Sequence, residues 1–137
     1  MAWRTSQRST QMTMNSAPAR MPRAGEIWYA YLDPILGHEQ GGNRPVVVVS
    51  ADWFNDATGS KLVVVVPLTT TDKPYPTHVL ITAAEAQLRV DSWAMCEQIR
   101  AVSFERFKKV RGTVSTQTLS ALRIMVTRIL HDRYTSS

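Results

Sequence analysis

The segment 38-HEQGGNRPVVVVS-50 places Arg44 almost directly before a run of four valines. Arginine carries N–H donors in a planar fork that matches phosphate oxygens, and a buried strand is a rigid support for that fork. Gly41, Gly42 and Asn43 precede it, and glycine can adopt positive φ and let a ligand approach the backbone. These residue types predict a phosphate-binding site. Taken alone, the pattern favours the alternative, a hairpin loop whose charges face water.

A second polar segment, 67-PLTTTDKPYP-76, follows another valine run. Threonine hydroxyls can donate to phosphate oxygens, a lysine adds positive charge, and a tyrosine ring can stack on a base. The alternative is structural, because threonine commonly ends strands and proline-flanked loops are polar. The candidate binding residues here are Thr69, Thr70, Thr71, Lys73 and Tyr75.

The third feature is Glu97-Gln98 within 94-AMCEQIR-100, which we predict to lie in a strand. A carboxylate and an amide inside a strand need polar partners. They either meet the first loop across the mouth of a barrel or form a cross-strand ion pair with an arginine. The neighbouring Cys96 would be a nucleophile only beside a histidine base, and we interpret it as a small core residue.

The histidines and acids show no metal-ligand spacing such as HExxH. His38, Glu39, His78 and His131 are the residues considered, and we expect no metal and no cofactor. Gly41-Gly42 also lacks the third glycine and the following helix of a dinucleotide-binding loop.

These residues must be positioned by a set of short strands followed by one helix. Aromatic and β-branched runs bounded by turn signals predict the strands, and the valine runs are expected to be buried on both faces. We predict strands at 26–32, 45–50, 61–68, 77–82, 92–100 and 110–113, a helical turn at 51–56 and a single turn at 103–106.

The last element is predicted to be a helix that begins after Ser115, a good N-cap residue. One face is apolar at helical spacing, and the opposite face is polar. We expect Leu119, Leu122, Val126, Ile129 and Leu130 to face the core and Arg123, Thr127 and Arg128 to point away. Strands followed by one helix predict an α+β, mainly β domain, in the form of a small β-barrel covered by helices.

Length and composition indicate one domain with tails. The chain has 137 residues, of which 44% are hydrophobic, and no apolar run approaches the roughly 18 residues of a membrane span. The single cysteine excludes an internal disulfide framework and is compatible with the reducing cytoplasm. We expect a disordered basic tail at 1–22, a domain at 23–132 and a C-terminal tail at 133–137.

The net charge of +5 lies mostly in the N-terminal segment, because residues 1–23 hold four arginines and no acid. The remaining residues hold 12 basic and 11 acidic side chains, so the charge of the whole chain is no argument for nucleic-acid binding. The N-terminal segment is also similar in composition to a transit peptide. A plainer interpretation is an upstream extension of a shorter chain beginning at Met21.

Together the residues resemble the MazF/PemK family of toxin endoribonucleases. The resemblance covers about residues 23–131 and is most specific in the pattern G-x-E-Q-x-G-x-R-P, followed by a valine strand and then P-L-T. The segments that carry it are 25-GEIWYAYLDP-34, 37-GHEQGGNRPVVVVS-50, 64-VVVPLTTTDK-73, 76-PTHV-79 and 96-CEQIR-100.

The resemblance implies a small SH3-like β-barrel that forms a homodimer and cleaves single-stranded RNA without a metal ion. Arg44 and Thr69 match the family's catalytic residues, and Glu97 falls where some members have an aspartate. Those members carry an arginine two residues before that acid, whereas this chain has Met95, so we expect Arg44 to take over its role. The substrate groove is implied to involve His38, Glu39, Gln40, Gly41, Gly42, Asn43, Thr70, Thr71, Lys73, His78 and Gln98.

The implied chemistry suits these residues. The 2′-hydroxyl of RNA is an internal nucleophile, and its attack yields a 2′,3′-cyclic phosphate and a 5′-hydroxyl. Arg44 would stabilise the transition state and donate to the leaving oxygen, Thr69 would orient the phosphate, and Glu97 or His38 would act as base. The implied partners are single-stranded mRNA and an antitoxin whose flexible segment covers the groove. Operator DNA would be bound only through the antitoxin complex, and no membrane is involved.

Two other functions remain open at this point. A catalytically silent SH3-like module would bind a peptide or nucleic acid in the same groove, but the presence of both Arg44 and Thr69 argues against it. A gyrase-poisoning toxin on the same barrel is marked by its C-terminal residues, and 131-HDRYTSS-137 has no comparable apolar ending.

Overall fold

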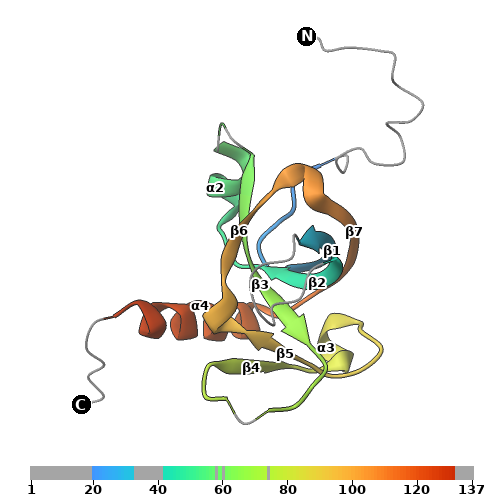
Figure 1. Cartoon of the computed structure of the whole chain (residues 1–137), viewed down its shortest axis with the longest axis vertical. Coiled ribbons are helices and arrows are strands. Elements are labelled where there is room, and N and C mark those ends of the chain that lie inside the picture. Colours follow the sequence, from blue (N-terminus) through green and yellow to red (C-terminus); the bar gives the residue numbers. More distant parts are fainter. Residues whose placement is uncertain (1–19, 33–41, 58, 60, 74, 132–137) are drawn as a thin grey trace.

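The computed structural model describes residues 20–32, 42–57, 59, 61–73 and 75–131 of the chain (Figure 1). Strands dominate, and the longest helix is the last element. The strands are β1 (Glu26–Leu32), β2 (Gly42–Val48), β3 (Leu62–Thr69), β4 (His78–Ile81), β5 (Ser92–Met95), β6 (Arg100–Ser103) and β7 (Phe107–Thr113). The helices are α2 (Asp52–Ala57), α3 (Ala83–Ala86), α4 (Thr116–Leu130) and the 3-10 turns η1 (Cys96–Gln98) and η2 (Phe104–Arg106).

Within the described residues, the seven strands form one antiparallel sheet in the order β4-β5-β3-β2-β1-β7, and β6 pairs with the first half of β3. Figure 1 shows β1, β2 and β7 curving round beside β3 and β6. The described ladders do not join β6 to β7, so the sheet is strongly curved but not closed. The predicted mainly β fold with a C-terminal helix is confirmed, and the word barrel applies only loosely.

Both faces of the central strands are buried, as the uninterrupted valine runs predicted. One face packs beneath α4 and contributes Ile27, Val47, Val66 and Leu68 to a helix-side core that includes Leu122. The other face lies inside the curve of the sheet. That inner core contains Trp28, Ala30, Leu32, Val46, Val48, Val63, Val65, Val102 and Phe107.

The predicted strand at 92–100 is wrong, because it is two strands separated by the η1 turn. β5 pairs with Leu68 and Thr69 at one end of β3, whereas β6 pairs with residues 62–65 at the other. The chain must therefore turn a corner between the two ladders, and η1 makes that turn. Glu97 and Gln98 consequently lie in a 3-10 turn rather than inside a strand.

The helix α4 begins after the predicted N-cap, since the Ser115 hydroxyl accepts a hydrogen bond from the Thr118 N–H. Leu122 is buried as predicted, but Ile129 and Leu130 are exposed because the helix extends beyond the sheet at its C-terminal end (Figure 1). Arg123 does not point away from the domain. Its Nε donates to the carbonyl oxygen of Val49 at 3.0 Å, so that prediction is wrong.

Residues 20–22 were predicted to belong to a disordered tail, and they contact the domain instead. Arg20 donates two hydrogen bonds to the Glu26 carboxylate, at 2.8 and 3.1 Å, and Met21 packs against the inner core. The Pro22 carbonyl accepts a hydrogen bond from the buried Asn55 side chain. Residues 1–19 and 132–137 lie outside the described part. No helix in that part is long and apolar enough to cross a membrane.

Candidate functional site

A groove of about 740 Å³ opens at one end of the inner core, where several strand ends meet. Its walls come from β1, β2, β3, the β3–β4 connection, β4, β5, η1 and β6. The lining residues are Leu32, Arg44, Pro67, Thr69, Thr71, Lys73, Tyr75, His78, Met95, Glu97, Gln98, Ile99, Arg100 and Ala101.

Arg44 and Thr69 reach the groove from neighbouring strands. β2 and β3 pair through Val46 and Pro67, and continuing this antiparallel register by two residues places Arg44 opposite Thr69. Arg44 forms no ion pair with any described residue, so its N–H donors are available for a ligand. The Thr69 Oγ1 accepts a hydrogen bond from the Thr71 N–H at 3.1 Å, which leaves its hydroxyl hydrogen free to donate.

Glu97 is the carboxylate of the groove, and both of its oxygens are held. Oε1 accepts a hydrogen bond from the Thr77 hydroxyl at 2.6 Å, and Oε2 lies 3.1 Å from Nε2 of His78. Partial burial raises the pKa of Glu97, but the hydrogen bonds from Thr77, its own backbone and His78 outweigh this effect. The net result is a pKa below the ordinary value for glutamate, so the side chain is ionised at neutral pH.

The hydrogen bond to Glu97 also defines the state of the His78 ring. An ionised carboxylate can only accept, so Nε2 carries a hydrogen. Nδ1 is buried and has no hydrogen-bond partner among the described residues. A buried N–H without a partner is rarer than a buried acceptor without one, so the neutral Nε2–H form fits this site. The ring of Tyr75 lies edge-on to His78, with ring centroids 4.9 Å apart, and covers it from the solvent side.

The structure brings most of the described candidate residues to this groove. Of the predicted residues, Arg44, Thr69, Thr71, Lys73, His78, Glu97 and Gln98 line it. Thr70 is exposed, and neither it nor Gly42 or Asn43 is among the lining residues. Gly42 has the positive φ expected of it, at 78°. His38, Glu39, Gln40 and Gly41 lie outside the described residues.

Two polar groups of the site were missed in the sequence analysis. Arg100 lines the groove, and its pairing opposite Val65 places it on the inner face of the sheet. Its alternation with the apolar Val102 could have indicated this orientation. Thr77 was assigned to a strand, but its hydroxyl holds Glu97 in place. No sequence pattern links Thr77 to a residue 20 positions later.

The remaining candidate chemistry lies outside the groove. Cys96 is fully buried in the helix-side core, as predicted. Burial and the nearby Glu97 charge raise the pKa of its thiol to about 11, which makes it a poor nucleophile. Among the described residues, no three His, Cys, Asp or Glu side chains come together as metal ligands would.

The fold and groove define a small β-domain that presents cationic and hydroxyl donors beside one ionised carboxylate, an arrangement suited to a polyanionic strand. The profile of the PemK-like, MazF-like toxins of type II toxin–antitoxin systems matches residues 23–130, and the chain belongs to this family.

Individual relatives agree with this assignment. Endoribonuclease MazF9 of Mycobacterium tuberculosis is 44% identical over 107 residues, covering 74% of this chain and 90% of the relative. The crystal structure of MazF from Deinococcus radiodurans is similar with a TM-score of 0.68 at 28% identity, covering 81% of this chain and 97% of that one. A MazE–MazF structure from the same organism aligns with a TM-score of 0.65 at 25% identity, covering 81% and 97% of the two chains.

Proposed function

We propose that the protein is the toxin of a type II toxin–antitoxin system and a sequence-selective endoribonuclease that cleaves single-stranded mRNA without a metal ion. The observation that carries the proposal is the presence of Arg44, Thr69 and Glu97 in one groove of a chain of this family. Cleavage of mRNA would stop translation and growth. The mRNA substrate also places the action of the protein in the cytoplasm.

In the proposed reaction, the nucleophile is the 2′-hydroxyl next to the cleaved phosphate. Glu97 takes its proton, the 2′-oxygen bonds to phosphorus, and the bond to the 5′-oxygen breaks. Arg44 donates hydrogen bonds to the phosphoryl oxygens as negative charge develops and donates to the leaving oxygen. Thr69 orients the phosphate through its free hydroxyl hydrogen. The products are a 2′,3′-cyclic phosphate and a 5′-hydroxyl.

Two features of the groove support these roles. Arg100 lines the same groove as Arg44 and supplies a second guanidinium, although Met95 occupies the position where some relatives of this family carry an arginine. Glu97 is ionised, one-third exposed and held by two hydrogen bonds, as a positioned base must be. His38 stays a prediction for this role, because it lies outside the described residues.

The experiment is primer extension on a long single-stranded RNA incubated with the purified protein in EDTA. We expect specific cuts by the wild type, with 5′-hydroxyl ends that a polynucleotide kinase can label directly. Arg44→Ala and Thr69→Ala should lose cleavage, whereas the control Lys61→Ala, an exposed residue away from the groove, should retain it. Full cleavage by Arg44→Ala would contradict its role, and loss of wild-type activity in EDTA would contradict the metal-free reaction.

The proposed partners are an antitoxin and a second copy of this chain. The structural similarity to a MazE–MazF complex supports an antitoxin, whose flexible segment would cover the groove and through which alone operator DNA would be bound. The homodimer is supported by apolar side chains left exposed on and beside α4. Leu130 and Trp53 are each 73% exposed, and Ile124 is 54% exposed. Such a surface is typical of protein–protein contacts.

A further inference from the structure

Outside the groove, basic and aromatic side chains gather on the outer face of β1 and β7. Residues 106–111 hold four of the 12 basic side chains that lie beyond residue 23, which is one-third of them within six positions. We call this surface the β1–β7 face. It consists of Tyr29, Tyr31, Arg106, Lys108, Lys109 and Arg111.

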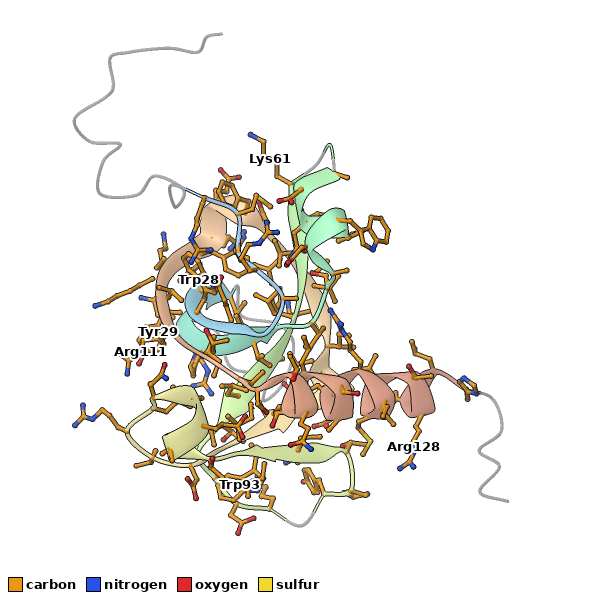
Figure 2. The ribbon with its side chains drawn as sticks, turned by 180° about the vertical axis from the view of Figure 1, so that it is seen from behind. Trp28, Tyr29, Lys61, Trp93, Arg111 and Arg128 are labelled. Carbon is orange, nitrogen blue, oxygen red and sulfur yellow. The ribbon has the colours of Figure 1, made fainter. Side chains whose placement is uncertain are left out.

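Each tyrosine of this face is paired with a guanidinium. The Arg111 Cζ lies 5.1 Å from the ring centroid of Tyr29, and the Arg106 Cζ lies 5.9 Å from that of Tyr31. Figure 2 shows Tyr29 and Arg111 beside each other at the flank of the sheet. The register places Lys109 opposite Tyr29. The face is therefore a row of rings and cations.

The cations of this face are not used to stabilise the domain through ion pairs. Lys108, Lys109 and Arg111 form no salt bridge within the described part of the chain, whereas Arg20 and Arg23 both do. Lys108 and Lys109 are exposed. A solvated charged face would need no aromatic rings, and here the rings alternate along β1 with core residues and point outward.

The β1–β7 face borders the groove at the end of β1. Leu32 lines the groove, and its neighbour Tyr31 lies on the outer face, where it is 41% exposed. On the adjacent strand, Arg44 belongs to the groove, and Asn43 pairs with Tyr31. A strand leaving the groove past Arg44 therefore meets Tyr31 first and Tyr29 next.

We propose that the β1–β7 face binds single-stranded RNA that continues out of the groove, with its bases on the Tyr–Arg pairs and its phosphates on the lysines. The inference rests on the proposed function. The Cα atoms of Tyr29 and Tyr31 are about 7 Å apart along a strand, wider than the ~3.4 Å rise of stacked bases. Each pair can therefore take one base from an unstacked strand. Aromatic rings and arginine planes are the usual platforms for such bases.

The aromatic rings favour RNA over an acidic protein segment as the occupant. Carboxylates need only cations, and Lys108 and Lys109 without rings would suffice for them. Stacking on a ring is sequence-tolerant, so this face would raise affinity for long RNA without changing the cut sequence.

The test uses the full chain in an Arg44→Ala background, so that RNA is bound but not cut. Fluorescence anisotropy would compare an RNA of about six nucleotides centred on a mapped cut with one of about 18, over a range of salt. The variants are Lys109→Gln with Arg111→Gln, and Tyr29→Leu. Lys61→Gln is the matched control, since Lys61 is an exposed cation that Figure 2 shows far from Tyr29.

We expect the double variant to bind the long RNA about tenfold or more weakly and to leave the short RNA unchanged. Its plot of log affinity against log salt should be shallower by about 1.4, since each lost phosphate contact on a single strand changes the slope by about 0.7. Tyr29→Leu should weaken long-RNA binding with little change in slope, because stacking releases no counterions.

The proposal is overturned if the double variant and the control bind the long RNA equally. It is also overturned if the double variant weakens both RNAs alike, or weakens only an acidic peptide of polyglutamate. Circular dichroism melting of each variant shows whether the fold is intact. These outcomes are separate from the proposed function, which fails if the wild type does not cut RNA or Arg44→Ala does.

Discussion

Nε2 of His78 lies 3.1 Å from Oε2 of Glu97, and the His78 side chain is almost completely buried. The pair joins β4 to the η1 turn, and the Thr77 hydroxyl holds the other carboxylate oxygen. Two neutral donors therefore fix the orientation of an ionised carboxylate at the groove. We expect His78 to act by positioning Glu97 rather than by contacting the RNA with an exposed nitrogen, because its Nδ1 is buried.

The first prediction concerns this pair. Glu97→Gln should lower kcat by about 10²- to 10⁴-fold, the usual contribution of a general base. His78→Ala should lower kcat with little change in KM, because the carboxylate loses its fixed orientation. His78→Gln should recover much of the activity, since the glutamine amide can donate from a similar position. Single-turnover and steady-state cleavage of a defined RNA would measure both constants.

The matched control is His131→Ala, which removes an exposed histidine just after α4 and should change neither constant. If Glu97→Gln cleaves at the wild-type rate, Glu97 is not the base and His38 becomes the remaining candidate. If His78→Gln is as impaired as His78→Ala, positioning by an Nε2–H donor is wrong.

Much of the site follows from one local rule, namely that polar residues directly after or before a buried strand lie at a shared edge of the sheet. Arg44 precedes a valine run and Thr69 follows one, and antiparallel pairing of these runs brings the two residues to the same end. The runs themselves were predictable because continuous apolar stretches of this length have no solvated face.

The parts that could not be predicted depend on contacts distant in sequence. The break at η1 arises because β3 pairs with two strands along its length, and a single strand at 92–100 would fit the local pattern equally well. Arg123 has the spacing of a solvent-facing residue, yet the carbonyl of Val49 lies within its reach. The helix face rotates accordingly, so Met125 packs on the core while Leu130 is exposed.

The second prediction concerns acid stability. Burial raises the pKa of Glu26, but hydrogen bonds from Arg20, the Arg23 backbone and Trp28 lower it further, and its net pKa lies below the ordinary value. A carboxyl group with a depressed pKa in the folded state stabilises the fold above its unfolded pKa of about 4.3. That contribution is lost as pH falls through the folded pKa.

Glu26→Gln should therefore lower the free energy of unfolding by about 1 kcal/mol at pH 7, a value kept small because Arg20 is exposed. The difference from the wild type should vanish at the acid end of a series of urea titrations. Glu105→Gln, at an exposed position, serves as the control and should match the wild type throughout. A difference that grows toward low pH would contradict the assigned direction of the pKa shift.

The third prediction concerns the single thiol. Cys96 is buried, and burial followed by the charge of Glu97 raises its pKa to about 11, so about one thiol in a thousand is ionised at pH 8. We expect Cys96 to react with a disulfide reagent such as DTNB only in denaturant. Cys96→Ala should be less stable, since a small core side chain is lost, yet retain cleavage of RNA. Rapid labelling of the folded protein, or loss of cleavage by a folded Cys96→Ala variant, would show that the thiol belongs to the site.

The fourth prediction concerns the contact between β7 and α3, which fixes one border of the β1–β7 face. A Cβ atom added at Gly112 would lie 1.9 Å from the carbonyl oxygen of Ala86, and a backbone atom cannot move aside as a side chain end can. Gly112→Ala should therefore lower the free energy of unfolding by about 3 kcal/mol or more. Urea titration at pH 7 measures this change. Gly59→Ala is the matched control, because nothing lies within 4 Å of its added Cβ, and its effect should stay within about 0.5 kcal/mol. Equal stability of the two variants would mean that α3 does not pack against β7 in solution.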